Sequence, residues 1–214
     1  MKRRVPPRRL LYFEKKAAQK GFCSICGLDE AGRGPLAGPV VASAVILKER
    51  HFKERIDDSK RLTVRQRERA FEEILQKAWV GVGEADIDLI DRLNIFQASW
   101  LAMERALASL HRKPDFLLID GRVPVQSDQK RWTLIHGDGR SLSIACASIV
   151  AKVTRDRLMA SYDREYPQYG FIRHKGYATV EHLKALRKYG PSPIHRKSFQ
   201  PVRLSQSERH ADID

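Results

Sequence analysis

The sequence predicts an α/β fold in which helices flank a mixed central sheet. Three observations support this class. Short apolar runs rich in β-branched residues alternate along the chain with longer segments of helical periodicity. Helix-capping residues stand at the start of several of these longer segments. The 214 residues are 42% hydrophobic, which is enough to bury the core of a single domain.

Five segments are expected to form strands. The first is an apolar run that ends on two acids and continues into a glycine-rich loop. The second follows that loop and is rich in Val, Ala and Ile. Val and Ile favour strands. The remaining three are shorter apolar runs bounded by polar or glycine residues. In order, the expected strands are Phe22–Asp29, Gly38–Leu47, Trp79–Glu84, Phe116–Ile119 and Trp132–Ile135.

Five further segments are expected to be helical. Thr63 and Gln66 form a capping-box pattern, and Asn94 and Thr179 are good N-cap residues. The longest helix begins with small residues, which allow a helix to pack closely on a sheet or on a ligand backbone. The expected helices cover residues 10–20, 63–77, 94–110, 143–166 and 179–189.

The chain is most simply one domain with a polar segment at each end. Residues 1–20 comprise a basic arm, with five Lys or Arg among its first nine residues, and a short helix. Residues 21–200 form the main domain. Residues 201–214 are a polar tail that is expected to be frayed.

The composition points to a polyanionic partner and away from membranes. The formal net charge is +14 with a pI near 10.0, which suits nucleic acid or an acidic surface, although some basic proteins bind no polyanion. No apolar run is long enough to span a bilayer, and no signal-peptide pattern follows the basic start. Three cysteines, an odd number, fit the reducing cytoplasm. The Cys23–Cys26 pair has no second pair at zinc-site spacing, so free thiols are expected.

The segment Gly27–Pro39 (GLDEAGRGPLAGP) is the first candidate for chemistry. Two acids stand where the first strand should end, and glycines, an arginine and prolines follow them. Acids beside a glycine-rich turn with free N–H groups suit a site for a metal and a phosphate. The alternative is an ordinary polar turn in which glycine supplies the backbone conformation.

Four carboxylates stand at the ends of predicted strands: Asp29, Glu30, Asp120 and Asp138. Loops beyond the carboxyl ends of parallel strands are where sites assemble in open α/β sheets, so these side chains are expected to converge. Crowded carboxylates without His or Cys favour Mg²⁺ or Mn²⁺. Because consecutive strand residues point to opposite faces, the turn is expected to begin at Glu30. Taken singly, Asp120 and Asp138 are also compatible with ordinary Asp-Gly turns.

The motifs together resemble the ribonuclease HII family, the bacterial type-2 ribonucleases H. The resemblance spans roughly residues 22–200, and the motifs stand in the family's order. The matching segments are Gly27–Pro39, Asp58–Leu62 (DSKRL), Asn94–Ala98 (NIFQA), Leu118–Gly121 (LIDG), Gly137–Asp138, Ser143–Arg157 (SIACASIVAKVTRDR) and His174–Thr179 (HKGYAT). Each short motif is weak alone, but the set is specific.

The resemblance implies a ribonuclease H-like fold with a C-terminal helical region. It also implies an endonuclease that cuts the RNA strand of RNA–DNA hybrids and cuts at single ribonucleotides within duplex DNA. The four carboxylates match the family's metal ligands. The loop residues Gly32, Arg33 and Gly34 match the ribonucleotide-recognition loop, and Tyr177 matches a tyrosine that stacks on the sugar at the RNA–DNA junction.

Basic side chains are expected to contact the duplex backbone. The candidates are Lys60, Lys152, Arg155, Lys175 and Arg187, each of which could equally be a solvated surface charge. Two positions depart from the family pattern. His136 stands where lysine is frequent, which puts a phosphate role for that side chain in doubt, and Cys146 replaces a usual alanine in the long helix.

The expected mechanism is hydrolysis with two divalent cations, Mn²⁺ or Mg²⁺, that leaves 3′-OH and 5′-phosphate ends. Asp29 and Asp120 are expected nearest the cations. Two rival functions are a non-catalytic RNA–DNA hybrid-binding protein and a hydrolase of small phosphates. The second lacks a Gly-x-x-x-x-Gly-Lys-[Ser/Thr] loop. A monomer is the simplest expectation for the oligomeric state.

Overall fold

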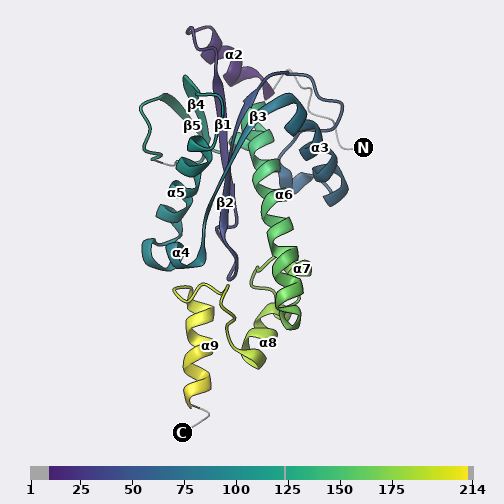
Figure 1. The fold of residues 1–214 in the computed structure, drawn as a ribbon, viewed down its shortest axis with the longest axis vertical. Coiled ribbons are helices and arrows are strands. Elements are labelled where there is room, and N and C mark those ends of the chain that lie inside the picture. The colour runs from purple at the N-terminus through teal and green to yellow at the C-terminus, as the bar shows by residue number, and fades with distance from the viewer. Residues whose placement is uncertain (1–9, 123, 212–214) are drawn as a thin grey trace.

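The central element of the structure is a five-stranded mixed sheet (Figure 1). The computed structural model describes residues 10–122 and 124–211, with side chains up to residue 205. The strand order is β3-β2-β1-β4-β5, in which β1 is antiparallel to β2 and β1, β4 and β5 are parallel. The predicted mixed sheet is therefore confirmed. The strands are β1 Ile25–Ala31, β2 Val40–Leu47, β3 Ala78–Ala85, β4 Phe116–Asp120 and β5 Lys130–Leu134.

Helices cover both faces of the sheet, and a C-terminal group extends beyond one end of it (Figure 1). Helix α5 packs on β2 and β3, whereas α6 packs on β1 and β2 from the opposite face with α3 beside it. Among the described helices, none combines the length and apolarity needed to cross a lipid bilayer. The helices are α2 Tyr12–Ala18, α3 Val64–Lys77, α4 Ile87–Leu93, α5 Ile95–Ala108, α6 Leu142–Glu165, α7 Phe171–His174, α8 Val180–Tyr189 and α9 Gln200–Ala211, with short 3₁₀ turns η1 Ser59–Arg61, η2 Gly137–Gly139 and η3 Pro167–Tyr169.

The capping residues that predicted the helix starts are in place. The Thr63 hydroxyl accepts the Gln66 N–H, and the Gln66 side chain accepts the Thr63 N–H in return, which completes the capping box of α3. Asn94 accepts two N–H groups at the start of α5, and Thr179 accepts one at the start of α8. Local side-chain chemistry therefore sets these three starts.

Helices α4, α7 and α9 differ from the sequence expectation. Helix α4 was not expected, although Asp86 caps it by accepting the Leu89 N–H. The polar C-terminal end is not frayed at its beginning, because α9 starts at Gln200 and its Val202 side chain is fully buried. Val202 packs in a cluster with Leu36 and Leu186, which docks this mostly polar helix to the rest of the chain. The predicted basic arm of residues 1–9 lies outside the described residues.

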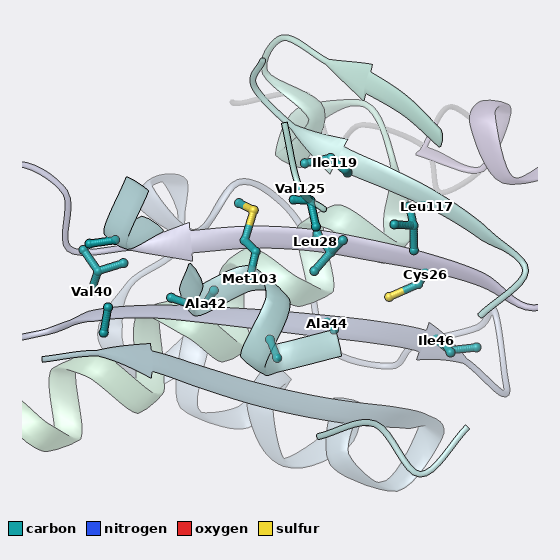
Figure 2. Packing of buried hydrophobic residues seen from close by; sticks show 14 of the residues in the cluster. Cys26, Leu28, Val40, Ala42, Ala44, Ile46, Met103, Leu117, Ile119 and Val125 are labelled. Atoms are coloured by element: carbon teal, nitrogen blue, oxygen red, sulfur yellow. The ribbon is translucent and has the colours of Figure 1, made fainter. Parts of the chain in front are cut away.

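A buried apolar cluster fixes β1 against β4 and α5 (Figure 2). Leu28 of β1, Leu117 and Ile119 of β4 and Met103 of α5 are all fully buried. Burying each such side chain stabilises the fold by about 1.5–3 kcal/mol. Because Leu28 pairs with Ile119 in the parallel register, this cluster also fixes how β1 and β4 are aligned.

On the opposite face, the start of α6 lies unusually close to β1. A Cβ atom on Gly27 would stand 2.2 Å from the backbone carbon of Ser143, so only glycine fits there. The following small residues of α6, including Ala145, Cys146 and Ala147, are fully buried. The expected close packing of this small-residue helix on the sheet is confirmed, and Cys146 is a buried free thiol within it.

Three histidines are packed together among the C-terminal helices. His182 donates from Nδ1 to the Tyr177 carbonyl at 2.9 Å, so its Nε2 accepts from Nε2 of His195 at 3.0 Å. The remaining nitrogen of His195 accepts the Ser192 N–H at 2.9 Å. His174 stacks on His182. Burial lowers the pKa of His182 to about 4 and that of His195 to about 3, so both rings are neutral.

These neutral rings predict a loss of stability in mild acid. An unfolded histidine titrates near 6.5, so below that pH the unfolded chain binds more protons and the free energy of unfolding falls as the pH falls towards the folded pKa values. The expected contribution of each ring is about 2 kcal/mol between pH 6.5 and pH 5. Urea unfolding at both pH values measures it. The fall in the free energy of unfolding between the two pH values should be smaller in His195→Asn and unchanged in His111→Asn, because His111 is exposed. An equal fall in the parent protein and in both variants would contradict the prediction.

Candidate active site

The site forms at the end of β4, where Asp120 lies beside Asp29 of β1. Leu28 and Ile119 are paired in the parallel register, and the next residues along the two strands are Asp29 and Asp120. Asp29 is buried, and Glu30 and Asp120 are half-buried. The expected convergence of acids from distant sequence positions follows from this parallel pairing.

The expected turn at Glu30 is wrong. Strand β1 continues through Ala31, which pairs with Val41 of β2. Asp29 and Glu30 therefore leave the strand on opposite faces. Asp29 bonds to Ser148 of α6, whereas Glu30 accepts from the Arg33 guanidinium at 3.1 Å. Both side chains nevertheless line the same pocket, which is also lined by residues of α6.

The acids crowd one another in a poorly solvated place. Burial, followed by the charges of Glu30 and Asp120, raises the pKa of Asp29 well above its usual range. Burial also raises the pKa of Glu30, although the Arg33 charge opposes the rise. The second carboxylate oxygen of Glu30, Oε2, is buried and has no partner among the described residues. A cation that binds the ionised carboxylates would offset their burial, reduce their mutual repulsion and give the unpartnered oxygen of Glu30 a partner.

Asp138 joins this cluster through the 3₁₀ turn after β5. The Gly137 N–H donates to Oδ1 of Asp120 at 2.6 Å, which ties the turn to the end of β4. Asp138 is buried, and burial together with the charges of Asp58 and Asp120 raises its pKa. His136 precedes the turn in a left-handed conformation and is exposed.

A pocket of about 220 Å³ opens beside the acids. Its wall includes the predicted recognition loop, Gly32 to Gly34, and the ring of Tyr177, which is 46% exposed. A Cβ atom on Gly34 would lie 3.5 Å from that ring, so the loop and the tyrosine lie next to each other in the pocket wall. The lining residues are Asp29, Glu30, Ala31, Gly32, Arg33, Gly34, Ser59, Lys60, Asp120, Ser148, Lys152, Arg155 and Tyr177.

The four predicted lysine and arginine contacts other than Arg155 divide into two that line the pocket and two that do not. Lys60 and Lys152 line the pocket. The pKa of Lys60 is raised, because the charges of nearby acids, Asp58 first, outweigh the opposing effect of burial. Lys152 is bonded to Asp156 at 2.7 Å, and burial lowers its pKa. Lys175 is half-buried, and neither it nor the exposed Arg187 is among the lining residues.

The expectation that Arg155 contacts a substrate phosphate is wrong. Its side chain is only 1% exposed, and its guanidinium donates to three backbone carbonyls. The sequence reasoning also missed Ser59 and Ser148, whose hydroxyls are 3.0 Å apart at the pocket wall. Both serines lie within the family-like segments quoted above, which was the signal available for finding them.

The donor set fits a hard divalent cation. Every candidate ligand is a carboxylate oxygen, and one of these oxygens is buried without a partner. In the described part of the chain, no three acidic, histidine or cysteine side chains already stand close enough to enclose an ion.

The arrangement has relatives among known proteins. Residues 26–202 match the family described as Ribonuclease HII. The chain belongs to the ribonuclease HII family. It is 56% identical over 197 residues to the ribonuclease HII of Geotalea daltonii, covering 91% of this chain and 90% of that protein, and 53% identical over 192 residues to that of Geobacter sulfurreducens, covering 89% and 88%.

Solved structures agree with this assignment. The ribonuclease H2 from Pyrococcus horikoshii superposes with a TM-score of 0.75 at 25% identity, covering 88% of this chain and 99% of that one. Bst-RNase HIII in complex with Mn²⁺ has the same fold, with a TM-score of 0.70 at 19% identity and coverage of 86% and 70%.

As a ribonuclease HII, the chain is a ribonuclease H, a divalent-metal-dependent endonuclease that acts on RNA–DNA hybrids. The predicted family, fold and enzyme class are confirmed, and the non-catalytic hybrid-binding alternative is set aside.

Proposed function

We propose that this ribonuclease HII cuts on the 5′ side of ribonucleotides, including single ribonucleotides embedded in duplex DNA, and leaves 3′-OH and 5′-phosphate ends. The observation that carries the proposal is the meeting of two features at one pocket. The acids at the ends of β1 and β4 lie beside a glycine loop that the backbone of a substrate can approach closely. In this proposal, the acids carry out the hydrolysis and the neighbouring glycine loop recognises the sugar.

In this proposal, Asp29, Glu30, Asp120 and Asp138 hold two divalent cations, Mn²⁺ or Mg²⁺. Bound there, the cations supply an activated water and neutralise charge on the phosphate and the leaving oxygen. Asp29 and Asp120 are the inner pair, because they follow the paired residues Leu28 and Ile119 on neighbouring parallel strands. Ser148 orients the Asp29 carboxylate by hydrogen bonding, and the Gly137 N–H orients that of Asp120.

The loop and the tyrosine read the sugar. In the described part of the chain, the N–H groups of Arg33 and Gly34 have no acceptor, so they are available to oxygens of the substrate. The 2′-OH is the group by which a protein distinguishes RNA from DNA. Tyr177 lies next to the loop and would pack against the same sugar. Together they would select a ribonucleotide on the 3′ side of the cut.

Lys60 and Lys152 would contact phosphates near the cut, and Lys175 would contact the duplex farther from it. The formal charge of +14 supports attraction to the duplex backbone. The further parts of the proposal are that the enzyme acts as a monomer and resides in the cytoplasm. Its three free cysteines support the second of these, because thiols persist in a reducing compartment.

The test uses an end-labelled DNA duplex that contains one ribonucleotide. It is incubated with Mn²⁺, with Mg²⁺ and with EDTA, and an all-DNA duplex serves as the control. We expect one metal-dependent cut on the 5′ side of the ribonucleotide and none in the all-DNA duplex. Cutting confined to long RNA–DNA hybrids would keep the family activity and overturn the single-ribonucleotide assignment. Cutting in EDTA would overturn the metal mechanism.

A further inference from the structure

Two arginines lie beneath the recognition loop and are almost completely buried. Arg155 of α6 is 1% exposed, and Arg196, in the segment between α8 and α9, is fully buried. Neither forms an ion pair with a carboxylate in the described part of the chain. Burying an unpaired guanidinium is costly unless its donors are satisfied in another way.

Backbone carbonyls of the segment between β1 and β2 satisfy these donors. Arg196 donates to the carbonyls of Gly32 at 2.6 Å, Arg33 at 3.1 Å, Pro35 at 2.7 Å and Gly38 at 2.7 and 2.9 Å.

Arg155 completes this arrangement from the other side. It donates to the carbonyls of Ala37 and Pro39 at 3.0 Å each. Its third bond, at 3.1 Å, goes to the Lys175 carbonyl, two residues before Tyr177. Two fixed charges thus hold six of the eight carbonyls of residues 32–39 and connect that segment to the loop that carries the tyrosine.

These carbonyl bonds decide where the N–H groups of the loop point. In a planar trans peptide, the C=O and N–H groups point in opposite directions. Because the Gly32 and Arg33 carbonyls point to Arg196, the N–H groups of Arg33 and Gly34 point away from it. Both residues line the pocket, and neither amide has an acceptor among the described residues. The buried guanidinium therefore turns this stretch of backbone into a pair of outward-facing donors.

Both arginines stay charged at neutral pH despite their burial. Burial lowers the pKa of Arg155 to about 10 and that of Arg196 to about 9. A lysine at either position has a single ammonium group and could not direct several planar donors to separate carbonyls at once. The lysine variants therefore remove the multiple bonds to the backbone.

We propose that Arg196 and Arg155 are positioning residues that set ribonucleotide selectivity by fixing the peptide planes of residues 32–39. They act through the N–H groups of Arg33 and Gly34 and make no contact with the substrate themselves. This inference rests on the proposed role of that loop in reading the sugar.

The test compares affinity for two duplexes in variants that cannot cut. In an Asp120→Asn background with Mg²⁺, the dissociation constant is measured for a DNA duplex with one ribonucleotide and for the same duplex without it. We expect Arg196→Lys and Arg155→Lys to reduce the preference for the ribonucleotide about tenfold, the loss of roughly one good hydrogen bond, with all-DNA affinity nearly unchanged. Arg157→Lys, on the exposed surface of the same helix, should change neither value.

An unchanged preference would overturn the inference, and so would an equal loss on both duplexes, which indicates a general charge effect. Amide hydrogen exchange provides a readout that needs no substrate. Exchange at Leu36 and Gly38, whose N–H groups bond to Gly176 and Ile194, should become at least tenfold faster in both lysine variants while β2 stays protected.

Loss of protection throughout β2 in both variants would contradict a local positioning role. If the parent protein shows no preference for the ribonucleotide, the proposed function of the loop fails. Faster exchange confined to residues 32–39 would then still support the positioning of the backbone by the two arginines.

Discussion

Replacing Asp120 by asparagine should lower cleavage of an RNA–DNA hybrid by roughly 1,000-fold or more, because a ligand that supports metal-dependent catalysis contributes several kcal/mol to the transition state. The substitution keeps the size of the side chain and the oxygen that accepts the Gly137 N–H. It removes one negative charge from the cluster with Asp29 and Glu30. Binding of the hybrid should therefore be retained while the rate of the chemical step falls.

Single-turnover cleavage and a binding titration on the same substrate measure the two quantities. Asp128→Asn is the matched control, since Asp128 is exposed and does not line the pocket, and it should cut like the parent protein. Turnover near the parent rate in Asp120→Asn would rule out the proposed role of this carboxylate. A parallel loss of binding and cleavage would point instead to a collapsed site.

Replacing Gly27 by alanine should destabilise the fold by about 3 kcal/mol, at the upper end of the usual cost of overpacking. The added Cβ would stand 2.2 Å from the Ser143 carbon and 2.4 Å from the Ile144 nitrogen, both of which are backbone atoms. No side-chain rotation can relieve that contact, so β1 and α6 must separate. Urea unfolding should show a midpoint lowered by about 1–2 M.

Gly139→Ala is the control for this prediction. A Cβ atom there meets nothing within 4 Å, and the conformation of Gly139 is not one that favours glycine. Its free energy of unfolding should stay within about 1 kcal/mol of the parent value. An equal effect at the two positions, or no effect at Gly27, would show that the contact between β1 and α6 is not rigid.

The features that the sequence predicted best depend on neighbours within a few residues. Thr63 and Asn94 cap helices with side chains that reach amides two or three positions away, and a short pattern contains everything needed to predict this. Alternation and apolar runs likewise located all five strands. Helix α9 was missed because its docking depends on Val202, one of few apolar residues in a mostly polar segment, which packs in a cluster with Leu36 and Leu186.

The candidate site was predicted as a set of residues more accurately than as an arrangement. The sequence alone pointed to Asp29, Glu30, Asp120 and Asp138, because acids that follow apolar runs mark strand ends. It could not show that Glu30 remains within β1, since that depends on pairing of Ala31 with Val41 in another strand. The orientation of the two adjacent acids was a property of the sheet.

The sequence by itself determined the fold class, the presence of the five strands and the family to which this chain belongs, because each depends on local patterns and on the order of motifs. Only the tertiary structure decided the role of the buried arginines. The sequence shows that residue 155 is a positively charged arginine, but the Pro39 carbonyl to which it donates lies 116 positions away. Whether such a charge faces solvent, a substrate or the backbone depends on which segments the folded chain brings around it.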